Sequence, residues 1–106
     1  MGINMAKLEI IGTKLPGEVV REVVLNSLNA RLKEVEETII KLQTALSEFE
    51  KKHGLSSDEF LEKWRSNLLE DNMDFFEWET CLILLQKLSK EREALKEVLD
   101  EALKYE

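Results

Sequence analysis

Apolar residues follow one another at alternating steps of three and four, without a break, across the 25 residues from Leu25 to Phe49. The series is Leu25, Leu28, Leu32, Val35, Ile39, Leu42, Leu46 and Phe49. This spacing puts every one of these side chains on a single narrow stripe of an α-helix, which is the pattern of a coiled-coil seam. A helix with such a stripe needs another helix to cover it.

The ends of this first helix carry their own signals. Pro16 has a fixed φ and no backbone N–H, which suits the first turn of a helix. At the other end the cations from Lys51 to His53 favour a helix C-terminus, and Gly54 can take the left-handed conformation that ends it. We therefore expect one helix over residues 16–53, roughly 55 Å long at about 1.5 Å per residue.

A second series at the same spacing predicts a long helix over residues 74–105. Its members are Trp78, Cys81, Leu85, Leu88, Arg92, Leu95, Leu99 and Ala102. If the two long helices pair in antiparallel fashion with Phe49 beside Trp78, Leu25 lies near Ala102 and Arg92 falls opposite Val35. The acidic residues within reach of Arg92 are then Glu34, Glu36 and Glu37.

The segment between the long helices predicts a short helix over residues 57–68. Ser56 and Glu59 have the spacing of a capping box at its start. Its apolar face consists of Phe60, Leu61, Trp64 and Leu68. Either Asn72 or Asp74 can cap the helix that follows.

The predicted fold is therefore all-α, a single helical domain over residues 1–106. It is a long antiparallel coiled-coil helical hairpin with a short bridging helix at its tip, which we define as residues 49–80. Residues 1–15 contain partly alternating apolar positions and predict a short N-terminal strand or arm.

The last helix is shorter than the first, so it covers the first helix only back to about Arg21 or Glu22. A valine-rich stretch before that point is left without an intrachain partner, and a two-helix hairpin buries only one stripe per helix. We therefore expect a homodimer or higher oligomer. The residues predicted at its interface are Val19, Val20, Val23 and Val24.

The composition narrows the class of partner and the location. A net charge of −7 argues against nucleic acid, because affinity for phosphates comes largely from Lys and Arg. The single cysteine cannot form an internal disulfide, and the chain shows no secretory signal. No apolar segment approaches the roughly 20 residues needed to span a bilayer. These features favour a cytoplasmic protein without membrane contact.

Catalysis has one weak candidate pair, the single histidine His53 and the single cysteine Cys81. Cys81 occupies a seam position, where a thiol packs well, and His53 suits the end of a helix. The sequence has no phosphate-binding glycine loop, no metal-type cysteine and histidine cluster, and no calcium-loop spacing. We expect no enzyme, no cofactor and no metal.

The tip combines aromatic and acidic residues. Six of the seven aromatic residues lie between Phe49 and Trp78, and residues 49–80 carry a net charge of −5. Most of these rings are needed to hold the short helix down, and acids in a first helical turn are favourable in any case. Phe75 and Phe76 cannot both point inward, so Phe76 is the expected exposed anchor of a partner surface. The predicted partner-binding residues are Phe76, Glu77, Glu79, Asp71, Asp74 and Glu70.

The run FEKKHGLSSDEFLEKW, followed by NLLEDNMDFFEWE and a leucine-rich helix, resembles a group of small prokaryotic antitoxin-like helical proteins of otherwise uncharacterised function. The likeness covers about residues 16–102. It implies a role in neutralising a partner within a toxin and antitoxin pair, and the implied partner is a basic toxin-like protein. The positions that carry it are Phe49, Glu50, Lys52, Gly54, Ser57, Glu59, Phe60, Asp74, Phe75, Glu77 and Trp78.

Two other functions stay open beside this antitoxin-like regulator. A structural or chaperone-like coiled-coil scaffold would be homodimeric and would hold clients without a dedicated partner. A DNA-binding regulator would use residues 7–13 as an arm, as at the start of a ribbon-helix-helix fold. That fold needs a second helix after a short turn, whereas the first helix here runs on, so we expect protein binding and no operator binding.

Overall fold

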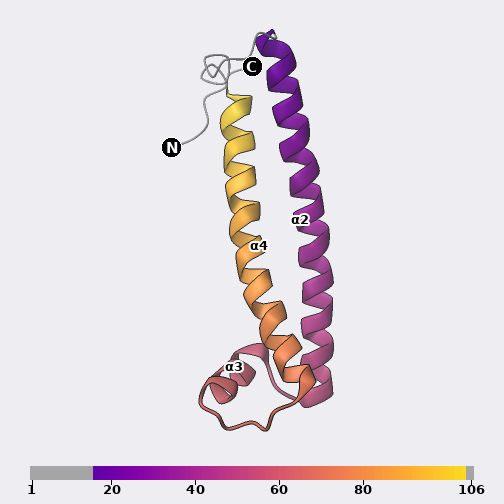
Figure 1. Ribbon diagram of the computed structural model, residues 1–106, viewed down its shortest axis with the longest axis vertical. Coiled ribbons are helices and arrows are strands. Elements are labelled where there is room, and N and C mark those ends of the chain that lie inside the picture. The colour runs from indigo at the N-terminus through magenta and orange to yellow at the C-terminus, as the bar shows by residue number, and fades with distance from the viewer. Residues whose placement is uncertain (1–15, 105–106) are drawn as a thin grey trace. The chain divides into compact units, whose positions relative to one another are not determined.

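The computed structural model describes residues 16–104, which form three α-helices. They are α2 (Gly17–His53), α3 (Ser57–Arg65) and α4 (Met73–Leu103), as Figure 1 shows. This part of the chain is all-α, as predicted. The predicted N-terminal strand or arm at residues 1–15 lies outside the described residues, as does the predicted end of the last helix at 105.

The helices divide into two compact units. One unit contains the described residues up to Glu36 together with those from Lys90 onward. The other is formed by residues 37–89 and includes α3. Each unit pairs a segment of α2 with a segment of α4.

In the first unit the two segments run antiparallel. The Arg21 Nη2 donates to the Ala102 carbonyl oxygen at 3.4 Å, and further along α2 the Arg31 Nη2 donates to Glu91 Oε1 at 2.9 Å. Residue numbers along α4 thus decrease in the direction in which residue numbers along α2 increase. The buried apolar side chains of this unit are Val35, Leu95 and Ala102.

The second unit has the same antiparallel pairing. Phe49 stacks on Trp78 with ring centroids 5.7 Å apart, as the predicted alignment requires, and His53 lies 2.9 Å from Asp74 through Nε2 and Oδ2. The buried apolar side chains of this unit are Ile39, Leu46, Phe60, Trp78 and Leu88.

Every buried residue of α2 and α4 in the described part of the chain belongs to one of the two stripes read from the sequence. The helical hairpin is therefore confirmed in the pairing of α2 with α4 within each unit. Supercoiling of the pair stays a prediction.

Arg92 interrupts the stripe of α4 at the predicted place. Its Nε lies 3.9 Å from Glu36 Oε2, so Glu36 is the acidic neighbour among the three expected. Within residues 16–104 that Nε is buried without a hydrogen-bond partner. A buried N–H group without a hydrogen-bond acceptor lowers the stability of the packed seam between the two helices.

The start and end of α2 follow from local chemistry. The Pro16 carbonyl oxygen accepts from the Val20 N–H at 3.2 Å, so Pro16 is the cap of α2 and the first helical residue is Gly17. Gly54 has a φ of +66°, and its N–H donates to the Glu50 carbonyl oxygen at 2.9 Å. This is the predicted left-handed stop.

α3 begins as predicted and ends early. The capping box joins Ser56 and Glu59, each side chain accepting from the other's backbone N–H. The predicted end at residue 68 is wrong, because α3 stops at Arg65. Asn67 takes a φ of +56°, and the Leu68 N–H then donates to the Lys63 carbonyl oxygen at 2.9 Å. This is a Schellman ending, in which asparagine replaces the usual glycine.

α4 begins at Met73, with Asn72 as its cap. The Asn72 Oδ1 accepts from the Asp74 N–H at 2.8 Å, which decides between the two residues that the sequence left open. No helix among residues 16–104 has both the length and the apolar character needed to cross a lipid bilayer.

Candidate partner-binding surface

Aromatic stacking holds α3 in the second unit. The rings of Phe60 and Trp78 lie face to face, 4.0 Å apart and 2° from parallel, and both side chains are fully buried. The indole N–H of Trp78 donates to Ser57 Oγ at 3.0 Å, so the one polar group of this ring is satisfied. Most of the aromatic residues are therefore core, as expected.

The adjacent Phe75 and Phe76 have different roles. Phe75 is half-buried and packs against Phe60 at 5.5 Å and against the edge of Trp64 at 5.8 Å. Phe76 is 47% exposed and meets Trp64 edge to face at 5.1 Å. Phe76 is thus the exposed member of the pair, on a base of packed rings.

Asp74 is the one predicted contact residue whose charge is used inside this unit. Its Oδ2 accepts from Lys52 Nζ at 2.6 Å and lies 2.9 Å from His53 Nε2. Hydrogen bonds from Lys52 and then from His53 hold the pKa of Asp74 below its usual value, against a smaller opposing effect of burial. Asp74 is therefore removed from the set that can offer a free charge to a partner.

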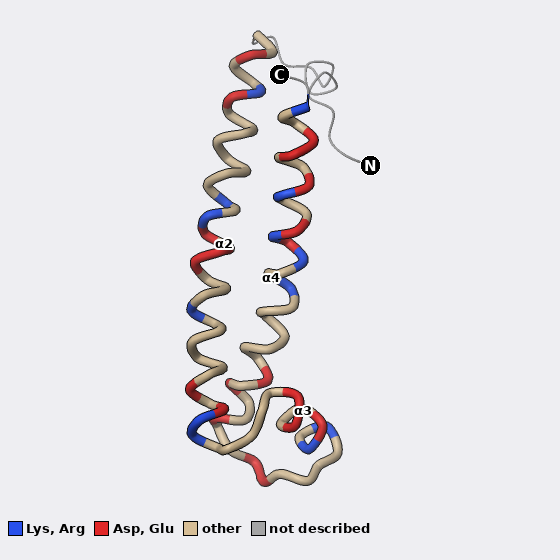
Figure 2. Tube along the Cα trace, turned by 180° about the vertical axis from the view of Figure 1, so that it is seen from behind, with Lys and Arg blue, Asp and Glu red and all other residues tan. Residues whose placement is uncertain are grey.

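The remaining acids of the set differ in exposure. Glu70, Asp71 and Glu77 are exposed, whereas Glu79 is half-buried. The sequence has no lysine or arginine between Arg65 and Lys87, so these acids have no basic neighbour along the chain. Figure 2 shows acidic positions on the segment that joins α3 to α4.

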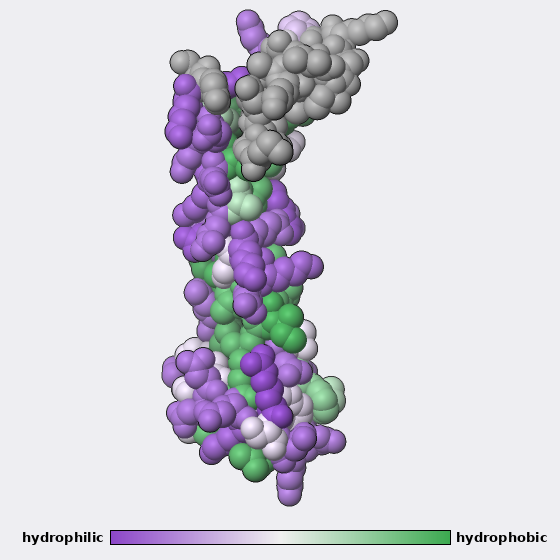
Figure 3. Space-filling view, turned by 90° about the vertical axis from the view of Figure 1, so that its left-hand side faces the viewer, coloured by the Kyte–Doolittle hydropathy of each residue, from purple (hydrophilic) through white to green (hydrophobic). Residues whose placement is uncertain are grey.

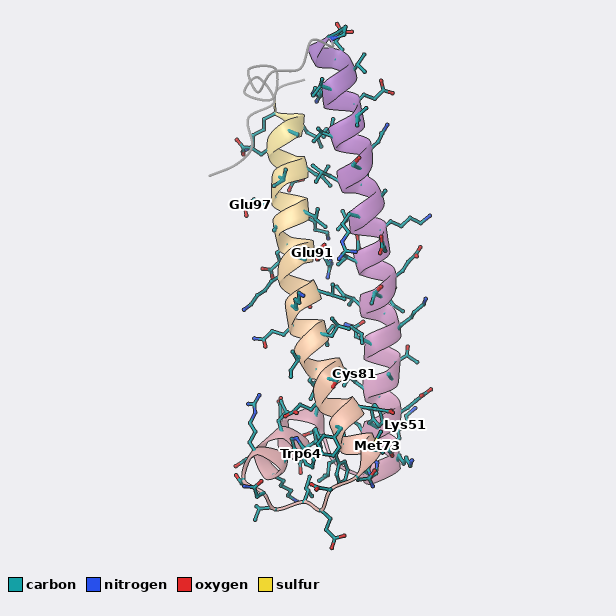
Figure 4. All side chains as sticks on the ribbon, in the orientation of Figure 1. Lys51, Trp64, Met73, Cys81, Glu91 and Glu97 are labelled. Carbon is teal, nitrogen blue, oxygen red and sulfur yellow. The ribbon has the colours of Figure 1, made fainter. Side chains whose placement is uncertain are left out.

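Two exposed apolar residues of the tip were not identified from the sequence. Leu68 is 71% exposed and Met73 is 72% exposed. The sequence had placed Leu68 on the packed face of α3, which is wrong because α3 ends three residues before it. Asn67 was the available signal, since asparagine tolerates the left-handed conformation that ends a helix. Figure 4 shows Met73 at the start of α4 and Trp64 on α3.

The exposed acids and apolar residues between positions 68 and 77 are close together in the chain, and we take them as one candidate surface of the second unit. We define the tip surface as Leu68, Glu70, Asp71, Met73, Phe76 and Glu77, all of which are exposed. Apolar anchors beside exposed charges are the usual composition of a protein-binding patch.

The candidate catalytic pair is not supported by the contacts. His53 has Asp74 as its hydrogen-bond partner, and its ring lies against Phe75 with centroids 4.9 Å apart. Cys81 packs against the aromatic cluster. Burial raises the pKa of its thiol, and the negative charge of Glu77 raises it further. A reactive cysteine needs the opposite shift.

The four valines predicted to form an oligomer interface differ in their exposure to solvent. Val19 and Val23 are exposed, at 44% and 59%, whereas Val20 and Val24 are half-buried. Among the described residues, no group of three or more histidine, cysteine or acidic side chains is placed to hold a metal ion.

Comparison with protein-family models, with curated proteins and with solved structures finds no match to this chain.

Proposed function

We propose that this chain is a non-enzymatic protein-binding module, an antitoxin-like regulator that covers a basic surface of a partner protein in the cytoplasm. The observation that carries the proposal is the tip surface, where exposed apolar side chains stand among acids that have no ion-pair partner in the described part of the chain. The anchors are Leu68, Met73 and Phe76.

The packed rings beneath this surface support the proposal. Phe76 rests on Trp64, and Trp64 stacks on the fully buried Phe60 at 5.9 Å. An anchor held on a rigid base loses little conformational entropy on binding, which favours affinity. The exposed carboxylates favour a partner of positive charge and speed its approach.

The test is co-purification from the native cells at moderate salt, with the bound protein identified by mass spectrometry. We expect one small basic protein at fixed stoichiometry. Phe76→Ala should weaken its binding by roughly 30-fold or more, the effect of truncating an aromatic hot spot. A double variant of the tip surface, Glu70→Lys with Glu77→Lys, should also release it, because positive charge then faces positive charge.

A matched control is Glu93→Lys with Glu97→Lys, which changes the net charge equally at two exposed acids of α4 outside the tip surface. This control should retain the partner. Binding that survives Phe76→Ala and the tip reversal, with the fold intact by circular dichroism, would reject the tip surface as the binding site.

The scaffold function makes a different prediction. It requires weak protection of many unfolded clients, so a single stoichiometric partner counts against it. Homo-oligomer formation through Val19, Val20, Val23 and Val24 stays a prediction, for which the exposure of Val19 and Val23 leaves room.

A further inference from the structure

The first half of α4 carries a second stripe on the side of the helix that faces away from its buried seam. Its members recur at alternating steps of three and four and are all exposed, and Leu84 lies beside them. Ile83, near its centre, is 60% exposed. The stripe consists of Met73, Phe76, Thr80, Ile83 and Lys87. We name it the outer stripe of α4.

The outer stripe of α4 has more exposed apolar residues than the part of α2 in the same unit. A surface helix normally has a polar outer face. In the same unit the exposed positions of α2 follow that rule, with Ile40 as their one apolar residue. The exposed face of α4 within this unit contains four large apolar residues, which are Met73, Phe76, Ile83 and Leu84. Figure 3, which views the molecule from the α4 side, shows hydrophobic side chains exposed between hydrophilic ones.

The charges along this face indicate what covers it. The end near Met73 holds the exposed acid Glu77, and the other end holds the exposed base Lys87. A parallel copy of the same helix would place like charges together, whereas an antiparallel copy places each Glu77 near a Lys87. The face is thus complementary to itself in one orientation.

We infer that the outer stripe of α4 binds the outer stripe of a second copy of this chain, in antiparallel orientation. Thr80 of each copy then lies beside Ile83 of the other. The same alignment brings Phe76 close to Lys87 of the second copy, where a cation–π contact adds to the ion pair with Glu77. Such a contact is isologous and therefore closes as a dimer.

The inference does not depend on the proposed basic partner, but it has a consequence for it. Phe76 and Met73 belong to both the tip surface and the outer stripe. A partner that engages these residues must therefore compete with the second copy, and partner binding and self-association exclude each other on one chain.

The test is sedimentation of the purified full chain, without partner, over a dilution series. The wild type should have the mass of two chains at high concentration and should dissociate on dilution. Ile83→Glu should have the mass of one chain throughout. The matched control is Ile40→Glu, an equally exposed isoleucine of α2 at 62%, which should behave as the wild type.

Charge exchange tests the orientation. Glu77→Lys and Lys87→Glu should each raise the dissociation constant of the dimer by on the order of tenfold, since a two-fold interface contains each changed pair twice. The double variant should return it to near the wild-type value. Circular dichroism of each variant checks that its helices are retained.

Three outcomes would overturn the inference. One is a wild type that has the mass of one chain at every concentration. The outer stripe of α4 would then be covered by a partner of different sequence or remain exposed. The second is an Ile83→Glu variant that still dimerises while Val23→Glu does not, which places the interface on the predicted valines. The third is a double charge variant that dimerises no better than the single ones. Because no partner is present, none of these outcomes bears on the tip surface as a partner site.

Discussion

Asp74 shows how one side chain can serve several local purposes within its unit. It lies in the first turn of α4, where a carboxylate is favourable to the helix dipole. The same carboxylate accepts from Lys52 and His53 in the last turn of α2. It therefore links the end of one helix to the start of another, and this internal role explains why it offers no free charge to a partner.

Replacing Asp74 with asparagine should lower the melting temperature at neutral pH. The folded-state pKa of this carboxyl is lowered, so its stabilising effect is present above the ordinary aspartate pKa of about 3.9 and is lost as the pH falls below that value. The difference between wild type and Asp74→Asn should thus be largest near neutral pH and should shrink as the pH falls below the ordinary aspartate pKa. Thermal melts followed by circular dichroism across this range measure it.

The control for this experiment is Glu93→Gln, which removes a charge from an exposed acid of the same helix that lies outside the tip surface and the outer stripe. It should change the melting temperature little at any pH. An Asp74→Asn effect that is equally large at low pH would mean that shape and not charge is responsible.

Two residues in the left-handed conformation terminate helices at their C-terminal ends. Gly54 ends α2, and Asn67 ends α3. Both lie in the second unit and turn the chain so that α3 can fold back onto Trp78. At Gly54 there is open space around the position of a Cβ atom. The requirement for glycine is therefore one of backbone conformation and not of packing.

Gly54→Ala should lower the free energy of unfolding by about 1–2 kcal/mol, the cost of the left-handed conformation for a residue with a Cβ. Gly17→Ala is the matched control, because Gly17 is the first residue of α2 and has no positive φ. It should leave stability unchanged or raise it by up to about 1 kcal/mol. Urea unfolding of both variants measures the difference, and an equal effect of the two would contradict the conformational explanation.

The part of the molecule that the structure describes has a small hydrophobic core for its length. Eight apolar side chains are buried in the described residues, while nine large hydrophobic ones are exposed. Small domains are marginally stable alone, and burial of exposed apolar surface in an oligomer compensates for this. The outer stripe of α4 is the part of that surface whose charges fit a second copy.

The melting temperature of the wild type should therefore rise with protein concentration, by about 3–5 °C for each tenfold increase if folding and dimerisation are coupled. That of Ile83→Glu should not depend on concentration. Calorimetry at several protein concentrations checks this. A wild-type melting temperature that is independent of concentration would show that the dimer contributes nothing to stability.

The sequence alone determined what depends on residues close together in the chain. The three-and-four periodicity predicted α2 and α4 and all the buried residues within them, and Ser56 and Gly54 marked helix ends because capping is a local effect. The pairing of Phe49 with Trp78 also followed, because two stripes of known length can be aligned in few ways.

Only the tertiary structure decided how each residue outside the stripes is used. Leu68 is exposed because Asn67 ends α3 early. The negative charge of Asp74 is paired inside the unit because Lys52 and His53 lie beside it in space. The outer stripe of α4 has the same spacing as a buried seam. Periodicity cannot tell the two apart, because exposure depends on which face another helix covers, and that is a property of contacts between distant segments.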